Sequence, residues 1–127
     1  MSLVMVVDDM ALVREPIAAA LRGAGYATVC AQDGAGAVSI AGQSRPDVIV
    51  LDVLMPGMDG MQVLRRLRGR SETAKTPVIL LTATSEKPVV MEAARLGVRD
   101  YILKTHFSLG ELLDRVDKCL TTAAAAA

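Results

Sequence analysis

The sequence predicts an α/β domain in which a parallel sheet is covered by helices on both faces. Five short apolar runs rich in β-branched residues alternate with segments of helical period along the 127 residues. Near-continuous apolar runs are typical of strands buried on both faces of a parallel sheet. Alternation without a helix-rich insertion implies right-handed crossovers, and hence a three-layer α/β/α sandwich with five strands and five helices.

The five candidate strands are separated by turn residues that fit this division. Pro46 and Pro77 stand shortly before the third and fourth strands, and Gly25 shortly before the second. The strands are predicted at Leu3–Val7, Tyr26–Ala31, Val48–Leu51, Val78–Leu81 and Tyr101–Leu103.

Apolar residues recur every three or four positions between these strands, which indicates helices. The first helix carries Val13, Ile17 and Leu21 on one face, and Pro16 inside it predicts a kink. The segment Gly34–Gly42 has the weakest helical pattern because its apolar residues are small and glycine recurs. Two further stripes consist of Val63, Leu64 and Leu67, and of Val90, Ala93, Ala94 and Gly97.

The last helix has the clearest apolar stripe, formed by Leu109, Leu112, Leu113, Val116 and Leu120. Ser108 and Glu111 in front of it have the spacing of a capping box. We therefore expect one domain over residues 1–122, followed by an alanine-rich tail, residues 123–127, that extends the helix or begins a linker.

Composition excludes several functional classes. The formal net charge is zero, with 14 basic and 14 acidic residues, so bulk charge does not favour direct binding to nucleic acid. No apolar run approaches the ~18 residues of a membrane span, and the start at Met1 lacks a signal-peptide pattern. We expect a cytoplasmic protein with no membrane association. Cys30 and Cys119 are too few for a disulfide framework, and one histidine, His106, adds no zinc site.

Residues with reactive side chains follow the predicted strands. Asp8 and Asp9 end the first strand, Asp52 the third, Thr82 the fourth and Lys104 the fifth. The carboxyl ends of strands in an open parallel sheet share one edge, where ligands bind. The sequence therefore predicts three carboxylates, a hydroxyl and an ammonium group in one cleft.

This combination favours phosphoryl transfer. Three neighbouring carboxylates repel one another unless a cation lies between them. A hard divalent ion with oxygen ligands fits, and Mg²⁺ prefers a few carboxylates together with waters and phosphate. Lys104 and Thr82 can donate to phosphoryl oxygens while a carboxylate attacks phosphorus.

Four blocks of sequence carry a resemblance to a known family. They are Val6-Val7-Asp8-Asp9, the segment from Leu51-Asp52 through Pro56 to Gly60, Leu80-Leu81-Thr82-Ala83, and Tyr101-Ile102-Leu103-Lys104. Their order and spacing resemble those of the response-regulator receiver domain of two-component signalling, of the chemotaxis-regulator type, and the match covers Val4 to Leu120.

The resemblance implies a flavodoxin-like fold with strand order 2-1-3-4-5 and a specific metal site. Asp52 would be the phosphorylated residue. Asp9 and Asp52 would bind Mg²⁺ directly, Asp8 mainly through water, and Leu54 through its backbone carbonyl.

The resemblance also assigns catalytic and switch residues. Thr82 and Lys104 would hold the phosphoryl oxygens, with Ala83 leaving room for them. Thr82 and Tyr101 would form the switch that reports phosphorylation to the face made by helix 4, strand 5 and helix 5. Receivers usually have a cis proline after the lysine, whereas this chain has Thr105. Since non-proline cis bonds are rare, we predict a trans Lys104–Thr105 bond.

The implied function is a signalling switch and not a metabolic enzyme. The domain would catalyse its own phosphorylation from a phosphohistidine donor and slowly hydrolyse the product. Its partners would be a sensor histidine kinase or a histidine phosphotransfer protein, and an effector domain or second copy on the helix 4–strand 5–helix 5 face.

Two alternatives remain open. One is a Mg²⁺-dependent phosphatase of the haloacid-dehalogenase type, although its usual D-x-D motif does not follow the first strand. The other is a degenerate receiver that binds partners without being phosphorylated.

The third predicted helix carries several arginines, which are Arg65, Arg66, Arg68 and Arg70. They form a solvated face by default, and contact with an anion or partner is the alternative.

Overall fold

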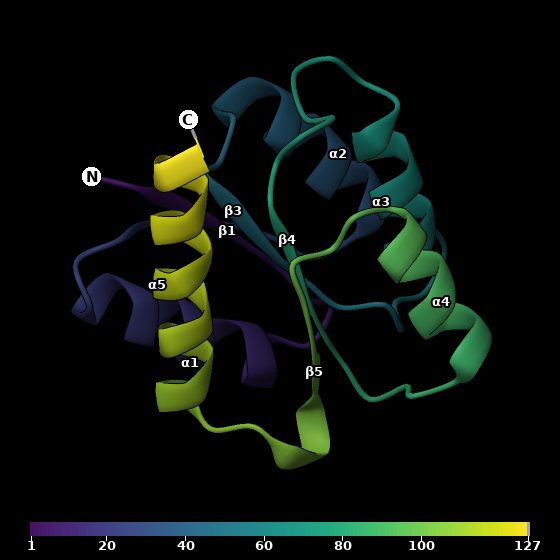
Figure 1. Cartoon of the computed structure of the whole chain (residues 1–127). Helices are drawn as coiled ribbons and strands as arrows, with labels where there is room; N and C mark the ends of the chain where they lie inside the picture. The colour runs from purple at the N-terminus through teal and green to yellow at the C-terminus, as the bar shows by residue number, and fades with distance from the viewer. Residues whose placement is uncertain (127) are drawn as a thin grey trace.

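A parallel sheet forms the middle layer of the structure, a computed structural model that describes the backbone of residues 1–126 and the side chains of residues 1–121 (Figure 1). Its strands are β1 (Leu3–Val7), β2 (Ala27–Ala31), β3 (Val48–Leu51), β4 (Val78–Thr82) and β5 (Asp100–Leu103). All neighbouring strands are parallel, and their order is β2-β1-β3-β4-β5. The predicted fold class and strand order are confirmed.

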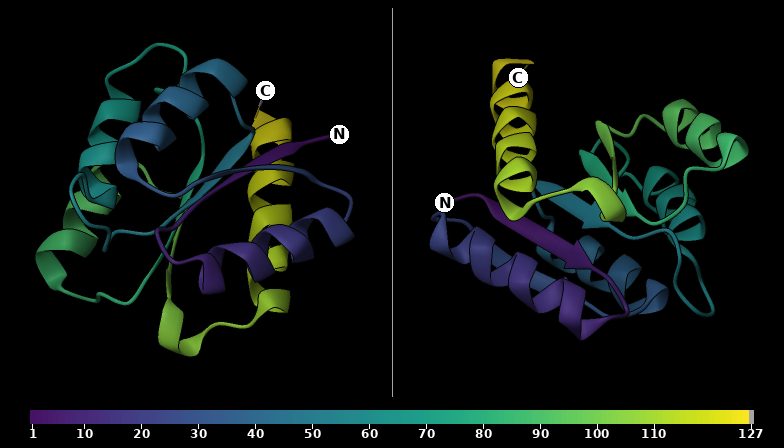
Figure 2. Two further views of the ribbon diagram at one scale, coloured as in Figure 1. Left: turned by 180° about the vertical axis from the view of Figure 1, so that it is seen from behind. Right: turned by 90° about the horizontal axis from the view of Figure 1, so that it is seen from below.

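Five α-helices cover the two faces of this sheet. They are α1 (Ala11–Gly23), α2 (Gly34–Ser44), α3 (Gly60–Arg68), α4 (Lys87–Arg95) and α5 (Leu109–Ala126), with a short 3₁₀ turn, η1 (Lys104–His106), after β5. Helices α1 and α5 lie on one face, and α2, α3 and α4 lie on the other (Figures 1 and 2). No helix of the described backbone is both long and apolar enough to cross a bilayer.

The alternation of side chains along each strand divides the apolar interior into two cores. Along β1, Met5 and Val7 point into the core under α2, α3 and α4, whereas Val4 and Val6 point into the core under α1 and α5. The second core is closed by residues of the predicted helical stripes, which are Ile17, Leu21, Leu112 and Val116. Aliphatic packing therefore fixes the sheet from both sides.

Local capping explains where several helices begin. The weakest predicted helix, α2, is real because Asp33 Oδ1 accepts a 2.7 Å hydrogen bond from the Gly36 N–H. Helix α3 begins with a capping box between Asp59 and Gln62, which was not among the predicted caps. Ser108 caps α5 by accepting from the Glu111 N–H at 3.1 Å.

The remaining predictions about the backbone concern three places. Pro16 lies inside α1, and the kink expected there stays a prediction. The Lys104–Thr105 peptide bond is trans, also as predicted. Helix α5 continues through the alanine-rich tail to Ala126, while Ala127 lies outside the described residues.

Candidate functional site

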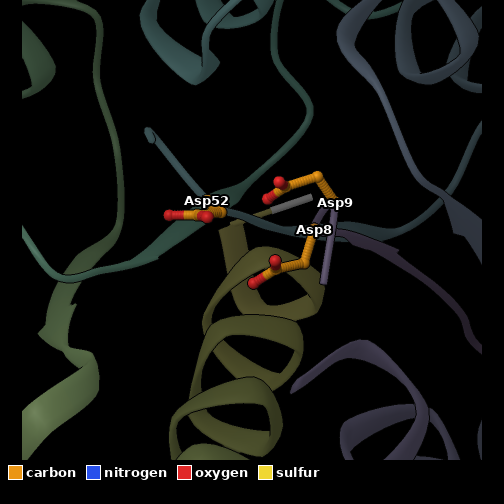
Figure 3. Close-up of side chains that lie close together, drawn as sticks. All are labelled: Asp8, Asp9 and Asp52. Carbon is orange, nitrogen blue, oxygen red and sulfur yellow. The ribbon is translucent and has the colours of Figure 1, made fainter. Parts of the chain in front are cut away.

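The carboxyl ends of β1 and β3 bring three aspartates together. One carboxylate oxygen of each of Asp8, Asp9 and Asp52 lies within 4.8 Å of the others. Figure 3 shows the three side chains gathered at this edge of the sheet. Asp8 and Asp52 are only 3% and 2% exposed, whereas Asp9 is exposed to solvent. The cluster is thus built from two buried carboxylates and one at the surface.

Lys104 reaches both buried carboxylates from the end of β5. Its Nζ lies 2.8 Å from Asp8 Oδ2 and 3.0 Å from Asp52 Oδ2. The second oxygen of each carboxylate accepts a backbone hydrogen bond, from Met10 to Asp8 at 2.9 Å and from Leu54 to Asp52 at 3.2 Å. Both carboxylates are therefore hydrogen-bonded on both oxygens, as buried polar groups require.

Burial raises the pKa of Asp52, and the charge of Asp8 adds to that increase. The hydrogen bond and charge of Lys104 and the Leu54 N–H act in the opposite direction, without cancelling it. Burial by itself would lower the pKa of Lys104, but its bonds to Asp8 and Asp52 raise it above its ordinary value. The ammonium group of Lys104 is therefore held in its charged form beside the aspartates.

The donor set fits a hard divalent cation. All three side chains supply carboxylate oxygens, and Asp9 keeps the cluster open to solvent. Mg²⁺ accepts such ligands and retains waters. The structure therefore brings Asp8, Asp9 and Asp52 together as the sequence predicted, while the predicted role of the Leu54 carbonyl stays a prediction.

Thr82 and Tyr101 are connected through the backbone of Thr84. Thr82 is fully buried at the end of β4, and its Oγ1 accepts a hydrogen bond from the Thr84 N–H at 3.4 Å. The half-buried Tyr101 donates from its Oη to the Thr84 carbonyl at 2.6 Å. The two residues that the resemblance singles out as a switch thus hold the same short segment.

Two residues that support the site were not identified from the sequence. Arg14 of α1 donates from Nη1 to the Asp8 carbonyl oxygen at 2.8 Å. Gly60, the first residue of α3, lies against β3: a Cβ added there would be 2.1 Å from the Asp52 carbonyl oxygen. The position of Gly60 in the block that contains Asp52 was the available signal, whereas nothing in the pattern pointed to Arg14.

The α/β sandwich carries acidic residues, a threonine and a lysine at one edge of its sheet. This is the arrangement of a phosphoacceptor α/β domain. A family model described as the response regulator receiver domain matches residues 4–117. The chain belongs to this family. The comparisons give the phosphatase alternative no support.

Relatives and solved structures agree with this assignment. The chain is 39% identical over 109 residues to the regulatory protein AtoC of Escherichia coli, covering 86% of this chain and 23% of that protein. It is 38% identical over 117 residues to the phosphate regulon transcriptional regulatory protein PhoB of Pseudomonas aeruginosa, covering 92% of this chain and 51% of that protein. The chain therefore spans about half or less of these relatives.

Among solved structures, the chemotaxis protein CheY4 of Vibrio cholerae superposes with a TM-score of 0.88 at 32% identity, covering 94% of this chain and 99% of that one. The signal receiver domain of a histidine kinase from Syntrophus aciditrophicus gives a TM-score of 0.86 at 33% identity, covering 96% and 92%. This chain thus resembles nearly the whole of some matched chains and only a part of longer regulatory proteins.

Proposed function

We propose that this domain is the phosphoacceptor of a histidine–aspartate phosphorelay and that Asp52 is the residue phosphorylated. The observation that carries the proposal is the buried Asp52 carboxylate, 3.0 Å from the Lys104 ammonium group and next to two further aspartates. A carboxylate oxygen of Asp52 attacks the phosphorus of a phosphohistidine, the P–N bond breaks, and the imidazole leaves as the acyl phosphate forms.

The surrounding residues stabilise the charge of the transferring group. Lys104 would supply a fixed positive charge, and the Thr82 hydroxyl, at the end of the neighbouring strand β4, would donate to a phosphoryl oxygen. Asp8, Asp9 and Asp52 would hold Mg²⁺, which when bound neutralises charge on phosphoryl oxygens. Slow autodephosphorylation would return the domain to its resting state. The whole cycle would take place in the cytoplasm.

A small phosphodonor tests this proposal without knowledge of the kinase. Incubation with acetyl phosphate and Mg²⁺ is expected to add one phosphoryl group, which is measured by mass spectrometry of the intact protein. The product should hydrolyse at alkaline pH, as acyl phosphates do, and peptide mapping after borohydride reduction should place it at Asp52. A phosphate that resists hydroxylamine and maps to a serine or threonine would contradict the proposal.

Mg²⁺ is expected to stabilise the fold through the three aspartates. A ligand that binds only the native state adds RT ln(1 + [L]/Kd), about 1.4 kcal/mol at ten times Kd. Asp9→Asn should remove most of this effect because the exposed carboxylate is lost as a ligand. The measurement is the melting temperature across a Mg²⁺ titration.

Asp117→Asn is the matched control, since Asp117 is an exposed carboxylate on α5 away from the cluster. It should respond to Mg²⁺ like the unmodified chain. If all three proteins respond equally, the stabilisation is not due to the aspartate cluster.

We further propose that the phosphohistidine donor docks on an apolar groove beside Lys104. The groove has a volume of about 310 Å³ and lies between α1, η1 and the start of α5. Leu12, Phe107 and Leu109 are among its lining residues, together with Lys104. A donor that delivers phosphorus to Asp52 must approach this edge, and Leu12 is 87% exposed there.

Leu12→Gln is expected to slow phosphotransfer from a histidine kinase about tenfold, because burial of a leucine contributes about 1.5–3 kcal/mol. Phosphorylation by acetyl phosphate should not change, since this donor needs no docking surface. Met91→Gln on α4, which also changes an exposed apolar residue, serves as the control. Equal slowing with both donors would show that Leu12 acts on the site itself.

We also propose that phosphorylation of Asp52 changes the surface formed by α4, β5 and α5, and that partners recognise this change. The support is the hydrogen-bonded connection from Thr82 through Thr84 to Tyr101 of β5. If Thr82 moves to bind a phosphoryl oxygen, the Thr84 segment and Tyr101 rearrange with it, which is a two-state change. An effector domain or a second copy would then recognise this face.

A further inference from the structure

A cationic hollow lies at the end of the sheet opposite the aspartates. It has a volume of about 420 Å³ and lies where α3 and α4 end and β4 and β5 begin. Four of its lining residues are positively charged, Arg68, Lys75, Arg95 and Arg99, and the others are uncharged. The zero net charge of the whole chain makes this a local concentration of positive charge.

None of these four cations takes part in an ion pair within the described side chains, residues 1–121. Lys75, Arg95 and Arg99 are exposed, whereas Arg68 is partly buried. In this arrangement the positive charges repel one another. No carboxylate of the described side chains pairs with these cations, so a bound anion would reduce the repulsion between them.

Arg68 is held in position by backbone carbonyls. Its Nε donates to the Leu96 oxygen at 2.8 Å, and its Nη1 donates to the Thr76 oxygen at 2.7 Å and to the Thr73 oxygen at 3.3 Å. Burial and the charge of Arg99 both lower the pKa of Arg68, in agreement with crowding of the two guanidinium groups. The floor of the hollow is therefore a preorganised cation.

A second hollow extends the positive region past Arg99. It has a volume of about 190 Å³ and is also lined by Arg115 and Lys118 of α5. Asp100, the one carboxylate residue in its lining, already pairs with Arg115. The two hollows share Arg99, so an extended anion could contact guanidinium groups on both sides of it.

The lining indicates recognition through phosphate groups. Guanidinium groups bind phosphate oxygens in a bidentate manner, which favours arginine over other cations at such sites. The aromatic residues Tyr26, Tyr101 and Phe107 are not part of either lining, so no platform exists there for stacking a base. Aromatic anchors of the kind that often dominate protein interfaces are likewise missing from the described lining of the larger hollow, whose one large apolar residue, Leu96, is partly buried.

We propose that this cationic hollow binds a small molecule with two or more adjacent phosphate groups, at a site separate from the phosphoacceptor. Arg95 and Arg99 would bind phosphate oxygens from the rim, Lys75 would add charge from the loop before β4, and Arg68 would form the floor. The site would make the domain sensitive to a phosphorylated metabolite independently of Asp52.

Inorganic tripolyphosphate is the probe, titrated calorimetrically into the whole chain at low salt with EDTA present to remove divalent ions. We expect saturable 1:1 binding that weakens as salt is added. Arg95→Gln/Arg99→Gln should weaken it roughly tenfold or more, because two sets of charge-assisted hydrogen bonds are lost. Lys75→Gln should act in the same direction from a different segment.

Arg66→Gln/Lys87→Gln is the matched control, since it removes two exposed positive charges from α3 and α4 outside the hollow. Measured at physiological ionic strength, it should leave the affinity within about a factor of two, because exposed charges outside the hollow are then screened. Equal weakening in both double variants would overturn the proposal in favour of non-specific charge attraction, and so would a lack of saturable binding. Tighter binding of a DNA duplex that the same Arg95/Arg99 variant abolishes would overturn it in favour of a nucleic-acid surface.

Discussion

Asp52→Asn is expected to abolish phosphorylation by acetyl phosphate and, in the absence of Mg²⁺, to raise the melting temperature of the domain. The first effect follows because an amide is not a nucleophile towards phosphorus. Complete loss of the added phosphoryl mass is expected, with the fold intact. A phosphorylated Asp52→Asn protein would show that another residue accepts the phosphoryl group.

The increase in stability follows from the raised pKa of Asp52. Burial disfavours the ionised carboxylate more than Lys104 stabilises it, so the folded state holds this proton more tightly than the unfolded state. Stability contributed by the protonated form is present below the ordinary pKa of aspartate, about 3.9, and is lost as the pH rises through the raised value. An asparagine carries no such loss at neutral pH.

Thermal unfolding in EDTA checks this sign. The stability advantage of Asp52→Asn should be present at pH 7 and shrink as the pH falls towards about 4, where Asp52 becomes protonated in both states. Asp117→Asn, a change at an exposed carboxylate, should show little difference. A lower melting temperature for Asp52→Asn at pH 7 would mean that the ion pair with Lys104 outweighs the cost of burial.

Lys104 contributes to the pH dependence with a separate window. Its raised pKa means that its ion pairs favour the folded state while the aspartates are ionised and Lys104 is protonated. This stabilisation is lost as the pH rises from the ordinary pKa of lysine, about 10.4, through the higher folded value, and for Asp52 it offsets only part of the cost of burial. The two effects therefore separate in pH, with Asp52 acting in the acidic range and Lys104 in the alkaline range.

The site could be predicted from the sequence because its residues directly follow strands. In a parallel sheet, the end of each strand fixes where the next residue lies, so Asp8, Asp52 and Lys104 converge whatever the intervening helices do. The strand order, by contrast, was predicted only through the resemblance to receiver domains, and the structure confirms it. Thr105 was also predictable, because the free-energy cost of a non-proline cis bond decides in favour of trans.

Features that depend on side-chain reach or on close backbone contact could not be predicted. The four arginines of the third helical segment looked like one basic patch, yet Arg65 pairs with Glu92 at 2.8 Å, whereas Arg68 binds three carbonyl oxygens. The cationic hollow joins Arg68 with residues of two other segments, which no periodicity relates. Likewise, the contact of Gly60 with the Asp52 carbonyl depends on how α3 meets β3.

Gly60→Ala is expected to destabilise the domain strongly, although the substitution adds only one methyl group. The added Cβ would lie 2.1 Å from the Asp52 carbonyl oxygen and 2.7 Å from the Val53 Cα, and both are backbone atoms that cannot rotate away. The Gly60 N–H also donates to the Val53 oxygen at 2.9 Å, which ties the start of α3 to this place. Overpacking of this kind costs about 1–3 kcal/mol, or more where backbone must shift.

We expect the melting temperature of Gly60→Ala to fall on the order of 10 °C. Because the clash displaces the backbone of the phosphoacceptor itself, phosphorylation by acetyl phosphate should also slow at temperatures where the variant is still folded. Gly69→Ala is the matched control: Gly69 has a φ of −84°, and its added Cβ would meet nothing nearer than 3.6 Å. That change should be neutral or stabilise by about 0.4–1 kcal/mol through the unfolded state. If Gly60→Ala melted like Gly69→Ala, the close approach of α3 to Asp52 would not be a requirement of the fold.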